Sequence, residues 1–177
     1  MPYLIAIDPG EVKCGVALFQ CKRGPEGEAK LLIGVRPETK DLFSWIEKIS
    51  PRKPVICYED FFLYPNYRKG GTGPIVRNLE AHRLNEMKTS QSIGVIKFAI
   101  ERFNLVSYHC MATVWKGKVK DNTLKQHDLW RRYSPDTARH IRDASGIGWY
   151  WHYYKGIFND GQRVYSLQER EMLDASM

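Results

Sequence analysis

The sequence predicts an α/β fold in which helices flank a mixed five-stranded sheet. Three short apolar runs near the N-terminus are separated by turn residues, which is typical of an antiparallel three-strand meander. Later apolar runs alternate with segments of helical periodicity, which favours parallel strands joined by helices. The chain has 177 residues, of which 43% are hydrophobic and 12% aromatic. These proportions allow one folded domain with a sizeable core.

The first three strands are expected at residues 3–7, 14–20 and 31–35. The first run ends at Asp8-Pro9-Gly10, a sequence typical of a turn. The second and third runs are joined by Gly24-Pro25-Glu26-Gly27, which favours a hairpin connection. An antiparallel edge of the sheet follows from this order.

A helix is expected next, with Thr39 as its cap and Pro51 just beyond its end. Its apolar residues recur with the helical period: Leu42, Phe43, Ile46 and Ile49. A fourth strand over residues 54–58 then leads into Glu59. This strand, helix, strand order after a meander indicates a mixed sheet with helices packed on it.

Residues 60–88 are predicted to form a long basic loop that can be partly helical after Pro74, because glycines and prolines punctuate the segment. These are Pro65, Gly70, Gly71, Gly73 and Pro74, accompanied by Arg68, Lys69, Arg77 and Arg83. Thr89 or Ser90 is expected to cap the following helix, which runs to about Phe103. Apolar residues occupy more than one face of that helix, so we expect it to be covered on two sides.

A fifth strand is expected over residues 105–110, followed by a basic segment at 116–142. The last helix is predicted to start at Ser134-Pro135 and to reach about Tyr154, and a polar tail begins at about residue 166. The sequence contains no internal repeat. We therefore interpret residues 1–177 as a single domain.

The chain is basic, with a formal net charge of +7 and a pI near 9.2, which favours an anionic partner such as nucleic acid. Four cysteines stand without CxxC or Cys/His spacing, so structural zinc is not expected and a reducing compartment suits them. The sequence has no apolar run of membrane-spanning length and no signal-peptide pattern. These features predict a soluble, unsecreted, cytoplasmic protein.

Three carboxylates occupy positions that a folded sheet can bring to one edge. Asp8 and Glu59 end predicted strands, and Asp143 lies in the last helix with His140 three residues earlier. Carboxylates brought together repel one another unless divalent cations hold them, and Mg²⁺ or Mn²⁺ suits such a site. The alternatives are an ordinary turn at Asp8, a solvated Glu59 beside Asp60, and a structural His140.

The stretch Ala6-Ile7-Asp8-Pro9-Gly10, with Gly15 five residues on, resembles the opening motif of the RuvC-type Holliday junction resolvases. This family belongs to the ribonuclease H-like superfamily. Glu59 after Val55-Ile56-Cys57-Tyr58 is similar to the family's strand-borne glutamate. His140-Ile141-Arg142-Asp143-Ala144 is similar to the closing helix motif. The resemblance spans roughly residues 3–154.

The resemblance implies a ribonuclease H-like fold and a metal-dependent endonuclease that cuts branched DNA such as four-way junctions as a homodimer. It further implies that Asp8 bridges two Mg²⁺ ions, with Glu59, Asp143 and His140 as the other ligands. We expect Mn²⁺ to substitute for Mg²⁺. The part played by Asp136, one turn before His140, stays open because the helix dipole alone explains an acid there.

The resemblance also suggests residues for DNA binding. Phe61 and Phe62 follow Glu59, where the family places aromatics that disturb base stacking, although an anchoring role within the protein is the alternative. Lys116, Lys118 and Lys120 would share one face of an extended segment and follow phosphates, or else lie on a solvated surface. The remaining candidates are Arg68, Lys69 and Lys125. The 60–88 loop is longer than its counterpart in the family.

Other functions remain open from the sequence. A nuclease of the same fold could act on RNA/DNA hybrids, flaps or forks, and a non-catalytic DNA-binding module is a further alternative. An actin-like ATPase is not expected, because 177 residues are too few for two lobes. The helix over residues 90–103 is the expected dimer contact, since Gly94 permits close approach of a second backbone.

Overall fold

The computed structural model describes residues 1–24, 27–60, 79–130 and 135–159. Its strands are β1 (Tyr3–Asp8), β2 (Gly15–Cys21), β3 (Ala29–Val35), β4 (Val55–Glu59) and β5 (Ser107–Cys110). Its helices are α1 (Thr39–Ile49), α2 (Leu79–Phe103), α3 (Ala112–Lys116), α4 (Asp121–Gln126) and α5 (Pro135–Trp149). A short 3₁₀ helix (Ser50–Arg52) follows α1, and a π-helix (Tyr150–Tyr154) continues α5.

The five strands form one mixed sheet in the order β3-β2-β1-β4-β5. The β1/β2 and β2/β3 pairs are antiparallel, whereas β1/β4 and β4/β5 are parallel. Because β1, β4 and β5 run in the same direction, their C-terminal ends lie at one edge of the sheet. This arrangement confirms the predicted three-strand meander followed by parallel strands.

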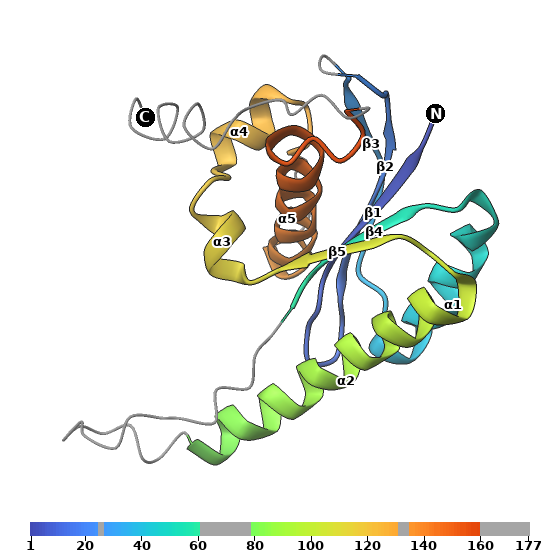
Figure 1. The fold of residues 1–177 in the computed structure, drawn as a ribbon. Coiled ribbons are helices and arrows are strands. Elements are labelled where there is room, and N and C mark those ends of the chain that lie inside the picture. Colours follow the sequence, from blue (N-terminus) through green and yellow to red (C-terminus); the bar gives the residue numbers. More distant parts are fainter. Residues whose placement is uncertain (25–26, 61–78, 131–134, 160–177) are drawn as a thin grey trace.

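Helices cover both faces of the sheet, with α3, α4 and α5 on one face and α1 and α2 on the other (Figure 1). Side chains of β1 alternate between the two layers, as strand geometry requires. Leu4 and Ala6 belong to the buried cluster beneath α5, together with Ile147. Ile5 and Ile7 belong to the cluster beneath α1 and α2. Both faces of the central strands are therefore buried, which explains their continuous apolar runs.

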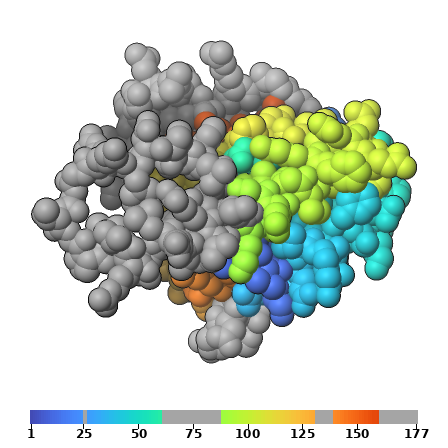
Figure 2. All heavy atoms as spheres, turned by 90° about the horizontal axis from the view of Figure 1, so that it is seen from below, coloured from blue at the N-terminus to red at the C-terminus, as the bar shows by residue number. Residues whose placement is uncertain are grey.

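Helix α2 begins at Leu79, so the cap predicted at Thr89 or Ser90 was wrong, whereas the helical part expected after Pro74 is observed. Residues 79–88 contain leucine, glutamate, alanine and arginine but neither glycine nor proline, and these residue types favour a helix. The first turns of α2 extend beyond the sheet (Figure 1), while its later turns lie beside α1 (Figures 1 and 2). The remainder of the predicted loop, residues 61–78, lies outside the described residues.

The cap predicted at Thr39 is also not the one observed. Glu38 holds the N-cap position of α1, and it makes no capping hydrogen bond with its side chain. The hydroxyl of Thr39 instead lies 2.9 Å from the Ser92 hydroxyl on α2. Ser92 donates to the Gly10 carbonyl at 2.7 Å, so these side chains connect α1 and α2 to the turn that follows Asp8.

The segment after β5 is not the extended chain in which Lys116, Lys118 and Lys120 would share one face, because it folds into α3, a turn and α4. The last helix begins at Pro135 and ends at Tyr154, in agreement with the prediction. Ser134 and the tail from residue 166 lie outside the described residues. All four cysteines are free. None of the helices in the described ranges has the length and apolar character that crossing a membrane requires.

Candidate active site

The last residue of β1 and the first half of α5 form the centre of the site. The carboxylate of Asp8 is buried, and its Oδ2 lies 2.6 Å from Nδ1 of His140. Gly15 pairs with Asp8 in the sheet, and a Cβ at Gly15 would lie 2.0 Å from the His140 carbonyl oxygen. Because Gly15 has no side chain, α5 can pack closely on β2, and this packing places His140 next to Asp8.

Glu59 ends β4, the strand next to β1, and lies on the same side of the sheet as α5. Its Oε2 accepts a hydrogen bond of 2.9 Å from Nε1 of Trp115 on α3. The neighbouring Asp60 instead forms an ion pair with Lys97 of α2 at 3.3 Å. Successive residues of an extended chain point to opposite faces, so only Glu59 of this acidic pair joins Asp8.

The third carboxylate, Asp143, lies one helical turn after His140 on α5. Its Oδ2 is 3.4 Å from the ammonium of Lys116, and that ammonium is 3.7 Å from Oε2 of Glu59. Lys116 thus lies between the carboxylates of β4 and α5. The structure brings Asp8, Glu59, His140 and Asp143 to one edge of the sheet, with Lys116 among them.

Burial and mutual repulsion dominate the electrostatics of this cluster. Burial raises the pKa of Asp8, and the charge of Asp143 raises it further, against the hydrogen bond from His140. Burial and the charge of Asp8 likewise raise the pKa of Glu59. Burial opposes the charged form of Lys116, yet the Glu59 and Asp143 carboxylates raise its pKa overall. Three carboxylates therefore share one lysine, which leaves the cluster with excess negative charge.

The donor chemistry of the cluster fits a divalent cation. Carboxylate oxygens suit Mg²⁺ and Mn²⁺, an imidazole suits Mn²⁺, and a divalent cation would balance the excess negative charge. Within the described ranges, however, no three His, Cys, Asp or Glu side chains are already gathered closely enough to hold an ion. The ammonium of Lys116 lies between Glu59 and Asp143, so this lysine must move before both carboxylates can share a cation.

The three lysines predicted to share one face do not do so, because the chain around them is not extended. Lys116 contacts Glu59 and Asp143, whereas the ammonium of Lys118 lies 5.7 Å from the centre of the Tyr154 ring. Lys120 precedes α4 and is exposed. Lys125 lies over the Trp130 ring, 5.1 Å from its centre.

Phe61, Phe62, Arg68 and Lys69 lie outside the described residues. Asp136 is in α5, but its side chain is not among those described.

Sequence reasoning missed the roles of Trp115 and Lys116 at the carboxylates. The two residues follow β5, and β5 pairs in parallel with β4 so that Cys110 lies opposite Glu59. The chain that leaves β5 must therefore start at the edge that carries Glu59. The sequence predicted both strands, and a parallel pairing of β4 with β5 would have placed Lys116 near Glu59.

Comparisons with known proteins support the fold at the level of structure. The sequence matches no protein-family profile, and no curated protein is significantly similar to it. The structure is similar to that of RuvC from Thermus thermophilus in complex with a Holliday junction substrate, with a TM-score of 0.59 and 16% sequence identity. The match covers 88% of this chain and 96% of that chain. A second structure of Thermus thermophilus RuvC gives a TM-score of 0.58 at 16% identity, with the same coverage. The chain therefore has a RuvC-like, ribonuclease H-like fold.

Proposed function

We propose that this protein is a metal-dependent endonuclease that cuts branched DNA, with four-way junctions as its main substrate. One observation carries the proposal. Asp8 and Glu59 at the ends of parallel strands lie beside His140 and Asp143 of α5. Nucleases that use divalent cations need such a set of oxygen and nitrogen donors.

Asp8, Glu59, Asp143 and His140 would hold two Mg²⁺ ions, and Mn²⁺ would substitute. When bound, the ions supply charge stabilisation at the phosphate and activate the attacking water. The residues of the chain prepare this chemistry. His140 orients Asp8 through its Nδ1, Trp115 orients Glu59, and Lys116 balances part of the carboxylate charge until a cation arrives.

A non-catalytic DNA-binding role is less consistent with the same residues. Buried carboxylates with raised pKa values lower the stability of the fold when they are ionised, and they repel phosphate. In a module that only binds DNA, these carboxylates would lower both stability and DNA affinity. A metal-dependent enzyme needs them, which favours the catalytic proposal.

Branched DNA is the proposed substrate because the structurally similar RuvC was solved with a Holliday junction substrate. A two-fold homodimer would present two sites to the two matched strands of a junction. Helix α2 is its proposed contact, since Phe98 is 58% exposed and the surroundings of Gly94 are open. RNA/DNA hybrids, flaps and forks would use the same chemistry, so they are the second candidate substrates.

A cleavage assay tests the proposal. Purified protein is incubated with a labelled four-way junction, a fork, a linear duplex and an RNA/DNA hybrid, each with and without Mg²⁺. We expect cleavage of the junction in Mg²⁺ and no cleavage by the Asp8→Asn variant. Preferred cleavage of the hybrid or the fork would favour the second candidates. Absence of cleavage of every substrate in Mg²⁺ and in Mn²⁺ would contradict the proposal.

A further inference from the structure

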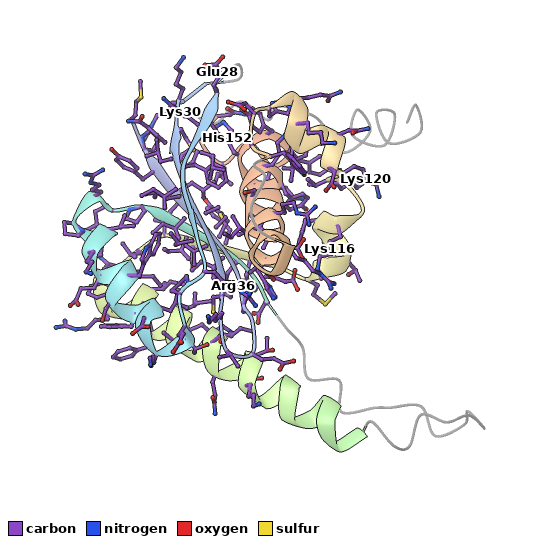
Figure 3. The ribbon with its side chains drawn as sticks, turned by 180° about the vertical axis from the view of Figure 1, so that it is seen from behind. Glu28, Lys30, Arg36, Lys116, Lys120 and His152 are labelled. Carbon is purple, nitrogen blue, oxygen red and sulfur yellow. The ribbon has the colours of Figure 1, made fainter. Side chains whose placement is uncertain are left out.

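A hollow of about 250 Å³ lies between α5 and the α3–α4 segment, directly beside Asp143. Three buried apolar side chains line it: Trp115, Val119 and Leu124. Lys116 and Lys120, which also line it, project on the α3–α4 side of α5 (Figure 3). The hollow therefore has an apolar base and a polar rim, and it adjoins the carboxylate cluster through a shared residue.

The rim of the hollow carries more positive than negative charge. Its four cationic residues are Lys116, Lys120, Arg139 and Arg142, and its two acidic residues are Asp121 and Asp143. Arg142 pairs with Asp121 at 3.6 Å, and Lys116 pairs with Asp143 at 3.4 Å. Lys120 and Arg139 are exposed and form no ion pair with another residue in the described part of the chain. Among the described residues, these two cations of the rim are therefore not neutralised by an acidic side chain.

Helix α5 sets the distance between this hollow and the candidate active site. Arg139 precedes Asp143 by four residues, so the two side chains lie on the same face of the helix, one turn apart. An anion held by Arg139 would therefore keep a constant distance from a group bound at Asp143. Lys120 comes from the other wall of the hollow, so Lys120 and Arg139 approach an anion from two sides.

We propose that this hollow binds the backbone phosphate next to the phosphate that lies at the carboxylate cluster. The inference rests on the proposed function and assigns a phosphate contact to Arg139 and Lys120. Arginine and lysine bind phosphate through charge-assisted hydrogen bonds. The apolar base formed by Trp115, Val119 and Leu124 suits the deoxyribose between two phosphates. The strand would be held on both sides of one sugar, which positions the bond to be cut.

The first experiment measures binding of thymidine 3′,5′-bisphosphate by isothermal titration calorimetry at low salt, without divalent metal. It compares wild type, the double variant Lys120→Gln/Arg139→Gln, and the control Lys48→Gln. Lys48 is an exposed lysine of α1, on the opposite face of the sheet. We expect the double variant to bind at least about tenfold more weakly and the control to bind like wild type. No binding by wild type, or equal binding by the double variant, would overturn the inference.

The second experiment locates the contact on DNA. Junction binding is measured for Asp8→Asn protein with and without the double substitution, using junctions in which one phosphate at a time is a neutral methylphosphonate. We expect one position beside the cleaved bond to weaken binding by the parent but not by the double variant. The slope of log K against log salt should also fall by about 2. Equal sensitivity of both proteins at every position would contradict the assigned contact.

The two experiments separate this inference from the proposed function. If wild type cleaves no nucleic acid but binds the bisphosphate through Arg139 and Lys120, the function is wrong and the anion site stands. If wild type cleaves junctions and the double variant binds the bisphosphate and DNA unchanged, the function stands and the anion site is wrong.

Discussion

Nδ1 of His140 lies 2.6 Å from Oδ2 of Asp8, although the two residues are 132 positions apart in the chain. This contact joins the end of β1 to α5 and places a hydrogen-bonding group beside a buried carboxylate. It also leaves Nε2 as the ring nitrogen able to bind a cation. The pair therefore orients Asp8 and brings a nitrogen donor to the carboxylate cluster.

The Asp8→Asn variant should lose cleavage and retain junction binding. The change removes a charge that holds metal but preserves β1 and the basic surface. We expect activity at the level seen without Mg²⁺, and the same for Glu59→Gln and Asp143→Asn. Asp60→Asn is the matched control, because Asp60 pairs with Lys97 on the other face of the sheet. Cleavage at the wild-type rate by Asp8→Asn would remove Asp8 from the active site.

Asp8→Asn should also be more stable than wild type at neutral pH. Burial raises the pKa of Asp8 above its ordinary value of 3.8, so the folded protein takes up the proton more readily than the unfolded chain. Ionisation of Asp8 therefore lowers the free energy of unfolding as pH rises through the folded pKa. Urea unfolding of wild type and Asp8→Asn at neutral pH and near pH 4 measures the difference in their free energies of unfolding. The advantage of the variant should be largest at neutral pH and shrink in acid. A variant less stable than wild type at neutral pH would show that other contacts of Asp8 dominate.

Lys116→Gln should bind Mn²⁺ more tightly than wild type. The ammonium of Lys116 lies 3.4 Å from Asp143 and 3.7 Å from Glu59, so it repels any cation that these carboxylates attract. Removal of one charge at this separation should raise the affinity by about tenfold. Calorimetric titration with Mn²⁺ measures this change, and Lys120→Gln serves as the control. Equal affinities of wild type and Lys116→Gln would show that the lysine does not compete with metal.

His140→Ala should lose most of its activity, and the loss should differ between metals. Imidazole binds Mn²⁺ better than Mg²⁺, so removal of the ring should alter the ratio of the rates with the two ions. The variant should also free Asp8 from its hydrogen-bond partner. Cleavage rates measured in Mg²⁺ and in Mn²⁺ check both effects. The same fractional loss with both metals would indicate that His140 only orients Asp8.

Phe98→Glu should dissociate the proposed dimer. Phe98 is 58% exposed on α2, so the substitution should leave the fold intact, although it removes the stacking contact with Phe43 of α1, whose ring centre lies 5.5 Å away. Ile96 is unsuitable because it is fully buried in the core of its own chain. Sedimentation at micromolar concentration should show a dimer for wild type and for Val114→Glu, a control on α3, and a monomer for Phe98→Glu. A monomeric wild type that still makes paired cuts in a junction would contradict the dimer.

The sequence by itself determined the strands, most of the helices and the four candidate site residues. Apolar runs and helical periodicity are local properties, so they predicted β1 to β5, α1 and α5 with small errors at their ends. Asp8 and Glu59 end predicted strands, so the sequence indicated that they could meet at one edge of the sheet, and the resemblance to the RuvC-type resolvases singled them out together with His140 and Asp143. A helical part after Pro74 was also expected, and α2 begins at Leu79, but the cap of this helix was wrongly expected at Thr89 or Ser90.

Only the tertiary structure decided which partners the charged side chains contact. Lys116 was predicted to join Lys118 and Lys120 in one row, but α3 directs it to Glu59 and Asp143. The contact of His140 with Asp8 likewise depends on the close approach of α5 to Gly15. A side chain's partner depends on which element packs opposite it, and residues far apart in the chain form that packing. Local patterns contain little information about such contacts, so the cluster around Lys116 and the hollow beside Asp143 emerged only from the folded structure.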